Sequence, residues 1–548
     1  MLPDILTISF AVFLAILLNL VSLILPKKIG TAAELVFSAA VIASLFIIFP
    51  SSQASILLAF GASAYGAFSP LTDRDKKEKR KELKQQLQTA ASVEIVQIKD
   101  ARRIAVDLLV TLLVCSGAVM FFVLAPDNYS LIKLFIGIWL ISVSGEMIER
   151  LGNFYSTRLF WLPDEERLVI LSQFQPRDFS LREVQEVRSE SSPDLLKLHP
   201  LFTFLSSNQD YTSSFGEVLK FSFPGEQVYI TPWKGDYWKS VFASYGKSWN
   251  LQQTKEILPL WHQAVVKRLF WKGYFAVAVK GVSAYTGLFL LLIWLNVPTW
   301  VIVLFILLWW TLNVYVSDRV LIAATDAEPL NEGEVYDRAQ SIFKEAGIAR
   351  TRLFIVDSPV YNGMATGMNI GRAAIMLTTA TLKLPLQSIE AILAHEAVHV
   401  KNRDVLLQQL ARLVFIGLVG GLVFLFYDEL KWLAQNHVFV TFVLVYTLMF
   451  LYPNYLSFFA QWMEVRADHL GASLLSGGHR QMADGLTDLA RAQERDLEKS
   501  MEYSLSNKRS ELRSSSILER DAWFWRFLEF QFQYHPPMYW RIQSFYNV

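Results

Sequence analysis

The chain has 548 residues, of which 53% are hydrophobic and 18% charged, whereas roughly 25% of residues are charged in typical globular proteins. Lys and Arg number 51 against 50 Asp and Glu, so the net charge of +1 gives no overall attraction to nucleic acid. The single cysteine, Cys115, excludes an internal disulfide and a cysteine-based zinc cluster. These figures exclude a disordered chain and favour a large membrane protein.

Nine apolar runs are long enough, or nearly long enough, to cross a hydrocarbon core. The sequence predicts spans at Ile5–Leu25, Ala32–Phe49, Ala54–Phe68, Ile104–Ala125, Leu131–Ile148, Gly281–Val297, Trp300–Val316, Leu410–Tyr427 and Val438–Phe459. The first run follows no basic segment, so it is predicted to be a span and not a cleaved signal peptide. Ala54–Phe68 is short, and the alternatives for it are a re-entrant piece or the far half of a kinked helix begun at Ala32.

The basic residues predict the orientation of these spans. Ten Lys and Arg residues lie in segment 72–103, whereas the short turns on the opposite side carry one, Lys431. Cytosolic loops carry such an excess of positive charge, so the N-terminus is predicted to lie outside. The long polar stretches are then cytosolic: 72–103, 149–275, 318–404 and 461–548. We interpret the basic run Arg74–Lys84 as a solvated helix in preference to an anionic-lipid patch.

The polar stretch between the fifth and sixth runs has the character of β-strands. Arg167–Phe174 and Leu219–Ile230 carry strand-forming residues, and Pro176, Gly225 and Pro232 mark turns. The pattern predicts a small α+β domain. Its sequence contains no nucleotide-binding loop, no Gly-rich fingerprint and no metal-binding cluster.

The predicted helix Ile389–His399 carries the pattern His-Glu-x-x-His. His395 and His399 stand at i and i+4, so they project from one face about one turn apart. That separation suits two ligands of a tetrahedral Zn²⁺. Glu396 lies about 100° around the helix and can reach a zinc-bound water without binding the metal. The five-residue pattern alone is not specific, because it recurs by chance in large sets of sequences.

A third ligand has to come from elsewhere in the chain. A carboxylate is the natural candidate, because the chain has one cysteine and its other histidines are scattered. Glu464 follows the last apolar run and can complete a two-His, one-Glu site that leaves a position for water. Asp468, four residues later, can accept the free ring N–H of a ligand histidine. Taken alone, each of these two residues fits an ordinary interfacial or helix-surface charge better.

The C-terminal half, from about residue 275 to 548, carries several motifs in a fixed order. They are Asp357-Ser-Pro, Asn362-Gly-Met-Ala-Thr-Gly367, Ala374-Ile-Met-Leu-Thr-Thr, Ala394–Asp404 (AHEAVHVKNRD), Glu464-Val-Arg-Ala-Asp468 and His535-Pro-Pro-Met-Tyr-Trp-Arg541-Ile. This ordered set resembles the HtpX-like zinc metalloproteases and, more distantly, the CAAX prenyl proteases. Gly363 and Met364 depart from the usual Ala-Phe of that family, a change that would alter the loop facing the substrate.

The resemblance implies one Zn²⁺ per chain, held by three ligands: His395, His399 and Glu464. Glu396 would take a proton from the attacking water and pass it to the leaving nitrogen. Asp468 would orient a ligand histidine, and Arg541 would support the site by pairing with an acid such as Asp468. In this interpretation Glu464 and Asp468 belong to the metal centre.

The resemblance also implies roles for residues outside the zinc helix. His535 is expected to donate a hydrogen bond to the oxyanion of the reaction. Asn362, together with the strand around Ile375 and Leu377, is a candidate for gripping an extended peptide through main-chain hydrogen bonds. Asp404 is expected only to cap or brace the helix after the zinc site.

The sequence therefore predicts a polytopic α-helical membrane protein of about nine spans. It combines a mostly α, gluzincin-type zinc protease domain with a small α+β cytosolic domain. The predicted parts are an N-terminal membrane region at 1–148, an α+β domain of unknown role at 149–275 and a protease module at 276–548. The protease module has spans at 281–297, 300–316, 410–427 and 438–459, and catalytic parts at 318–404 and 461–548.

The predicted function is that of an integral-membrane zinc endopeptidase. Because the zinc helix and the third ligand each lie close to a span, the expected substrates are membrane or membrane-proximal proteins, cut at the cytosolic face of a bacterial plasma membrane. The HtpX resemblance implies protein quality control. No nucleic acid partner is expected, and homo-oligomers are compatible with the sequence. The alternatives are a regulated signalling protease, a prenyl-protein-type protease and, from another class, a non-catalytic scaffold or a transporter. The scarcity of charges within the spans argues against a transporter, and the intact ligands and base argue against an idle scaffold.

Overall fold

The computed structural model describes residues 3–24, 27–124, 130–190, 192–202, 208–245, 261–276, 292, 297–367, 373–436, 438–504, 531, 533 and 535–546. The predicted span Gly281–Val297 lies almost wholly outside these residues. The chain divides into two compact units. The first consists mainly of residues 1–203 and 208–305, and the second mainly of residues 306–501 and 507–548.

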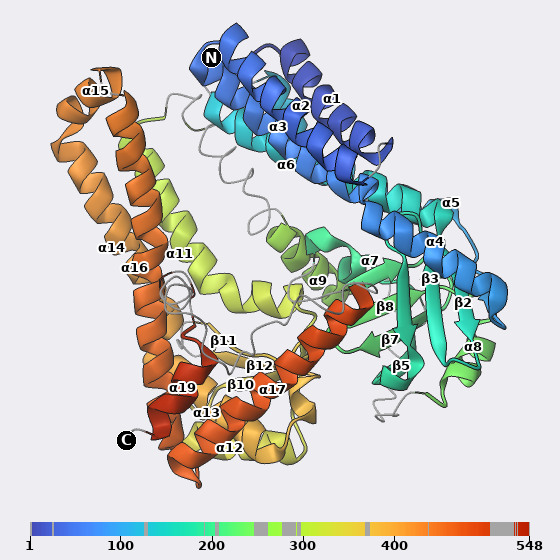
Figure 1. The fold of residues 1–548 in the computed structure, drawn as a ribbon. Coiled ribbons are helices and arrows are strands. Elements are labelled where there is room, and N and C mark those ends of the chain that lie inside the picture. Colours follow the sequence, from blue (N-terminus) through green and yellow to red (C-terminus); the bar gives the residue numbers. More distant parts are fainter. Residues whose placement is uncertain are drawn as a thin grey trace. The chain divides into compact units, whose positions relative to one another are not determined.

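Five long helices of the first unit coincide with the first five apolar runs. They are α1 (Ile5–Ile24), α2 (Lys27–Ile48), α3 (Ser51–Thr72), α5 (Ala101–Leu124) and α6 (Ser130–Ser156). α3 packs against α1 and α6, and α5 packs against α6 (Figure 1). α2 and α3 are separate helices that contact each other, which contradicts the alternative of one kinked helix begun at Ala32. Gly145 permits close packing of α6 on α3, because a Cβ there would lie 2.5 Å from the carbonyl oxygen of Ala67.

Length and composition qualify three helical stretches of the described residues as membrane spans. They are Gln53–Thr89, Trp300–Ala324 and Asp404–Leu425. A fourth would combine Ala101–Leu113 with Cys115–Leu124, which meet at a bend of 44°. Ile5–Leu20 and Ala32–Ile48 are shorter apolar helices. Three or four spans are therefore supported in the described part of the chain, and the count of about nine stays a prediction.

Two four-stranded sheets complete the first unit, with strand orders β1-β2-β3-β4 and β5-β7-β8-β6. The strands are β1 (Val93–Ile95), β2 (Arg158–Leu162), β3 (Arg167–Leu171), β4 (Arg177–Ser180), β5 (Glu186–Glu190), β6 (Asn208–Tyr211), β7 (Val218–Phe223) and β8 (Glu226–Ile230). The strands predicted at Arg167–Phe174 and Leu219–Ile230 correspond to β3 and to the β7–β8 hairpin, which turns at Gly225. Three further helices belong to this unit: α7 (Leu195–Leu198), α8 (Gly235–Phe242) and α9 (Gln263–Tyr274).

The basic segment 72–103 is part of this α+β fold. α4 (Arg74–Thr89) is capped by the side chain of Asp73 and buries Leu83 against strands β2 and β3. β1 then pairs antiparallel with β2. The outer face of α4 leaves three lysines exposed: Lys77, Lys81 and Lys84. The predicted solvated helix therefore has one packed face and one solvated face.

Buried charges connect α5 and α6 to the sheet that contains β6. Asp107 of α5 pairs with Arg103 at 2.6 Å and with Arg150 of α6 at 2.5 Å. Asp210 of β6 pairs with the same two arginines at 3.0 and 2.6 Å. Two positive and two negative charges offset one another, as burial requires. This pairing gives Asp107 a structural role.

The second unit contains a mixed sheet of strand order β11-β12-β10-β9 and the helices around it. The strands are β9 (Glu328–Pro329), β10 (Arg352–Val356), β11 (Gly363–Thr366) and β12 (Ala374–Thr378). The helices are α11 (Thr299–Ala324), α12 (Glu334–Glu345), α13 (Leu386–Asn402), α14 (Asp404–Leu425), α15 (Tyr427–Asn436), α16 (Val438–Ala472), α17 (Gly478–Ser504) and α19 (Met538–Tyr546). β10 and β12 are parallel, and β11 runs antiparallel to β12.

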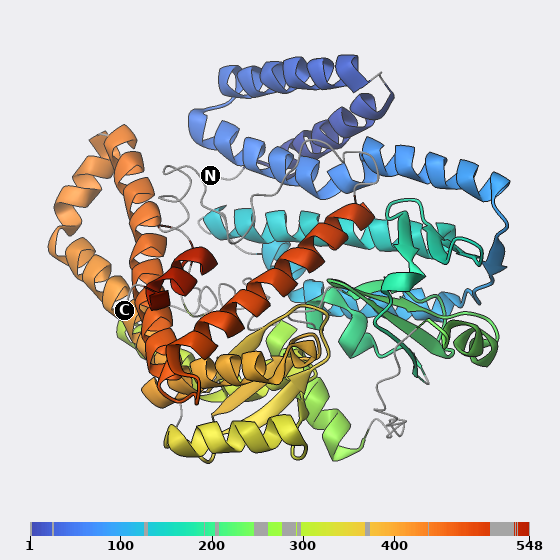
Figure 2. The same cartoon turned by 60° about the horizontal axis from the view of Figure 1, so that its bottom comes forward.

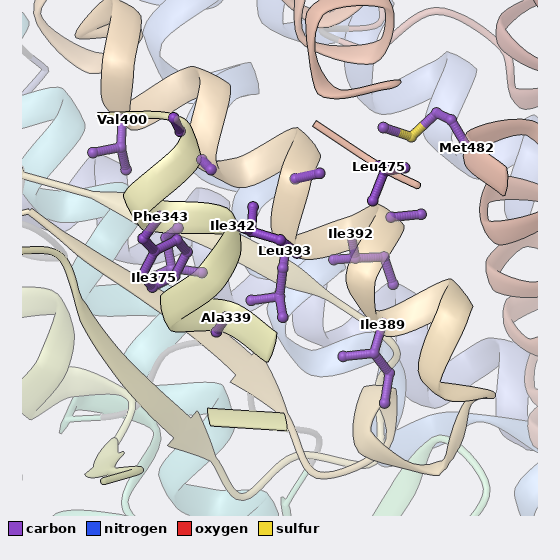
Figure 3. Packing of buried hydrophobic residues seen from close by; sticks show 14 of the residues in the cluster. Ala339, Ile342, Phe343, Ile375, Ile389, Ile392, Leu393, Val400, Leu475 and Met482 are labelled. Carbon is purple, nitrogen blue, oxygen red and sulfur yellow. The ribbon is translucent and has the colours of Figure 1, made fainter. Parts of the chain in front are cut away.

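One apolar core joins the sheet to α12, α13 and α17. Phe343 of α12, Ile375 of β12 and Leu393 of α13 are fully buried in it, and Figure 3 shows their side chains among those of the same buried cluster. Each such side chain contributes about 1.5–3 kcal/mol when removed from water. α14 and α16 extend together from this core and are joined by α15 at their far end (Figures 1 and 2). The core therefore fixes α13 against the first residues of α14 and the last turns of α16.

Candidate metal centre

α13 carries the predicted zinc-helix residues at the middle of the second unit. Most of the helix is buried, because the sheet, α12, α16 and α17 all contact it. Small residues allow this crowding: a Cβ on Gly471 of α16 would lie 3.2 Å from the carbonyl carbon of Ala394. α13 ends where Arg403 adopts the left-handed conformation, with φ at 55°. The chain turns sharply there and enters α14 one residue later.

His395 and His399 direct their Nε2 atoms toward each other and toward Glu464 of α16. The two Nε2 atoms are 3.0 Å apart. Glu464 places Oε2 3.4 Å from Nε2 of His395 and Oε1 3.5 Å from Nε2 of His399. Ligand atoms bonded at about 2.0–2.1 Å to a tetrahedral zinc ion lie roughly 3.4 Å from one another. The three residues therefore fit a zinc ion, and they form the cluster that could hold a metal among the described residues.

A buried carboxylate and an arginine orient His395. Asp468 lies with Oδ1 2.8 Å from Nδ1 of His395. Arg541 of α19 donates two hydrogen bonds to Asp468, at 2.6 and 2.8 Å, and approaches Oε2 of Glu464 at 3.3 Å. When Nδ1 donates its proton to Asp468, Nε2 keeps a lone pair for a metal. The structure thus brings the predicted residues Asp468 and Arg541 together beside the ligands.

His399 has a carboxylate partner of its own, which the sequence motifs did not reveal. Asp404, in the first turn of α14, places Oδ2 2.8 Å from Nδ1 of His399. Its other oxygen accepts a hydrogen bond from Arg466 of α16. The prediction gave Asp404 only a capping or bracing role. Its place five residues after His399 was the available signal, but the left-handed turn that folds α14 back toward the site could not be read from that spacing.

Carboxylates around the two histidines raise the pKa of both imidazoles. Burial by itself lowers the pKa of His399, but hydrogen bonds to Asp404 and Glu464 outweigh it and raise that pKa to about 10. Burial is likewise outweighed at His395, whose pKa is raised by Asp468 and Glu464. At Glu464 burial acts to raise the pKa, and the neighbouring imidazoles hold it well below its usual value. A metal cation would take the place of these imidazole protons.

Glu396 lies next to the ligands and close to strand β11. Its side chain is buried, and a Cβ built on Gly363 would lie 3.4 Å from its Oε1 atom and 2.7 Å from Cγ2 of Ile392. The absence of a side chain at residue 363 therefore lets β11 approach the zinc helix closely. His535 places Nδ1 3.1 Å from Oε1 of Glu464 with 70% of its side chain exposed, so it stands at the open side of the centre.

The predicted peptide grip by Asn362, Ile375 and Leu377 is wrong. β12, which contains Ile375 and Leu377, is paired on both edges, by β10 and β11, and both side chains are fully buried. The main chain of Asn362 is also occupied. Its N–H donates to the hydroxyl of Thr381 at 2.9 Å and its carbonyl accepts from the N–H of Thr378 at 3.1 Å. None of the three residues has main-chain groups left for a substrate.

Comparisons with protein families agree with the geometry of this centre. Residues 329–547 match the model described as Peptidase family M48, and residues 158–246 match the model described as Bacterial PH domain. The first match contains all three candidate ligands and Glu396. The second covers the strands from β2 to β8. The prediction of an α+β domain did not identify this second family.

Curated relatives carry the name Protease HtpX homolog. The relative from Pelotomaculum thermopropionicum is 42% identical over 103 residues, which are 18% of this chain and 37% of that protein. The relative from Moorella thermoacetica is 26% identical over 236 residues, 40% of this chain and 77% of that protein. This chain spans about two fifths or less of the length of the Pelotomaculum protein and of three other relatives with the same name. The predicted resemblance to HtpX-like proteases is confirmed.

One solved structure is similar at a lower level. Ste24p of S. mikatae aligns over 53% of this chain and 66% of its own, with 18% identity and a TM-score of 0.35. A score of this size supports no argument about the fold or the site. The family match and the ligand geometry carry the assignment of the centre.

The affinity for zinc is expected to rise with pH. Because the pKa of His399 in the metal-free protein is raised to about 10, its proton must leave when zinc binds, and acid therefore competes with the metal. Each proton released changes the affinity about tenfold per pH unit. Competition titrations with a chelator of known affinity between about pH 6 and 8 measure this slope. An affinity independent of pH would contradict the account.

Proposed function

We propose that the Peptidase family M48 domain of this chain acts as a zinc-dependent endopeptidase at a membrane surface. The observation that carries the proposal is the meeting of His395, His399 and Glu464 at distances that suit one zinc ion. Glu396 stands next to the two histidines on the same helix and does not take part in the ligand cluster. The intact set of ligands and base argues against a non-catalytic scaffold.

The chain's own residues divide the work of peptide hydrolysis. Zinc, when bound to the three ligands, lowers the pKa of a water molecule and polarises the peptide carbonyl. Glu396 accepts a proton from the attacking water and delivers it to the leaving nitrogen. His535, on the open side of Glu464, donates a hydrogen bond to the carbonyl oxygen as negative charge develops there. Asp468 and Arg541 hold His395 in the orientation that the reaction needs.

Strand β11, and not β12, is the candidate for binding an extended peptide. It is at the end of the strand order, and within the described residues no other strand pairs with its outer edge. Its Gly363 lies close to Glu396, so a peptide added at this edge would run past the general base. Main-chain hydrogen bonds to such an edge bind many sequences, whereas pockets for side chains select among them. This arrangement suits a protease of broad specificity.

The location of the ligands supports substrates in or near the membrane. Asp404 begins α14, a candidate membrane span, two residues after α13 ends. Glu464 lies five residues beyond the apolar run that ends at Phe459. The distribution of Lys and Arg favours the cytosolic side for both segments. We therefore propose cleavage of membrane or membrane-proximal proteins at the cytosolic face, with protein quality control as the role that the resemblance to HtpX-like proteases implies.

The variant Glu396→Gln tests the proposed chemistry. We expect the hydrolysis of casein, or self-cleavage, by the purified protein in detergent to fall about 10²- to 10⁴-fold, because the general base is lost. Zinc content should stay at one ion per chain, since Glu396 is not a ligand. Glu390→Gln is a matched control on the same helix, because Glu390 hydrogen-bonds to Gln481 and not to the centre. Undiminished hydrolysis by Glu396→Gln would refute the mechanism.

Single cysteines test the proposed orientation. After Cys115→Ser, the exposed residues Ser51 and Thr89 are replaced by cysteine one at a time. We expect a membrane-impermeant maleimide to label the cysteine at residue 51 in intact cells, and the one at residue 89 only after the cells are permeabilised. The positive charges around α4 are the physical reason. Labelling of Thr89→Cys in intact cells would contradict the proposed orientation of the basic segment.

A further inference from the structure

A chain of three side chains connects the second zinc-ligand histidine to the end of a predicted membrane span. Asp404 is buried, with 5% of its surface exposed, and one carboxylate oxygen lies 2.8 Å from Nδ1 of His399. The other oxygen is paired with Arg466 of α16. The guanidinium of Arg466 stacks over the ring of Trp462 at 4.4 Å from the ring centre. Trp462 is 49% exposed and follows the apolar run that ends at Phe459 by three residues.

The two histidines are thus held by separate charge pairs. Asp468, which orients His395, is paired with Arg541 from α19, whereas Asp404, which orients His399, is paired with Arg466 from α16. Glu464 lies between Trp462 and Arg466 in the sequence of α16. The same two turns of α16 therefore supply the candidate ligand Glu464 and also Arg466, which holds the carboxylate of Asp404 beside His399.

We propose that Asp404 and Arg466 are positioning residues that retain zinc at the centre, with Trp462 holding the Arg466 guanidinium in place. The proposal rests on the proposed function, because it assumes zinc at the three ligands. Asp404 fixes the proton of His399 on Nδ1, so Nε2 presents its lone pair to the metal. Arg466 balances the charge of Asp404 and fixes its plane by pairing with the oxygen that faces away from His399. The stacked ring restricts the guanidinium to one orientation.

Zinc retention measures this role separately from peptide hydrolysis. The full chain is loaded with zinc in detergent and mixed with the chelator 4-(2-pyridylazo)resorcinol, whose colour reports the rate of zinc loss. Replacing a carboxylate that orients a ligand histidine typically weakens metal binding about 10- to 100-fold, and we expect an acceleration in this range for Asp404→Asn. Arg466→Met should accelerate zinc loss less, because Asp404 stays in place but is no longer held.

The double variant tests whether Arg466 acts through Asp404. If it does, adding Arg466→Met to Asp404→Asn should leave the rate of zinc loss unchanged, because the effects of residues in one network do not add. Asp488→Asn is the matched control. Asp488 accepts a hydrogen bond from Ser388 of α13, the helix that carries His399. The Asp488→Asn variant should lose zinc at the rate of the unmodified protein. Unchanged zinc loss in Asp404→Asn, or full additivity in the double variant, would overturn the proposal.

These outcomes are distinct from a failure of the proposed function. A protein that binds no zinc, or hydrolysis that survives in Glu396→Gln, would remove the protease chemistry itself. A zinc-loaded, active protein in which Asp404→Asn loses zinc at the unmodified rate would remove only the positioning role of Asp404 and Arg466. The rate of zinc loss and the rate of hydrolysis are therefore measured on the same preparations.

Discussion

The catalytic unit depends on one constraint, which is that two imidazoles and one carboxylate must meet within the reach of a single ion. His395 and His399 come from α13, whereas Glu464 comes from α16, and α14 and α15 lie between them in the chain. Contacts between imidazoles and carboxylates support this arrangement, because Nδ1 of His399 lies 2.8 Å from Asp404 and its Nε2 atom lies 3.5 Å from Glu464. The apolar core around Leu393 supplies the rigid support, and close packing at Gly471 keeps α16 against α13.

Much of the centre could be predicted, because helical spacing is a local property. His395 and His399 at i and i+4 follow directly from the helix period, and motif order added Glu464. The prediction that Asn362, Ile375 and Leu377 bind a peptide was wrong for the opposite reason. Strand order is a non-local property, and the sequence around Ile375 does not show that β10 and β11 pair with both edges of its strand. Asp404 was undervalued because its contact depends on a left-handed turn at Arg403.

In the N-terminal half, too, non-local contacts could not be predicted from the sequence. The strands around Leu168 and Phe221 were predictable from composition, and both are present. The basic segment was expected as a solvated cytosolic helix, yet it contributes Leu83 to a core and β1 to a sheet. β1 pairs with a strand more than sixty residues later in the chain, with Glu94 opposite Phe160. Local sequence patterns do not encode such a pairing. The similarity of residues 158–246 to a bacterial PH domain emerged only from the comparison.

X-ray absorption at the zinc edge of the purified full-length protein tests the central claim most directly. The account predicts one zinc per chain with two imidazole nitrogens and carboxylate or water oxygens at about 2.0–2.1 Å. It also predicts that Glu464→Gln changes this coordination shell or removes the metal. A protein without zinc, a shell with three or more imidazoles, or a spectrum unchanged by Glu464→Gln would contradict the account.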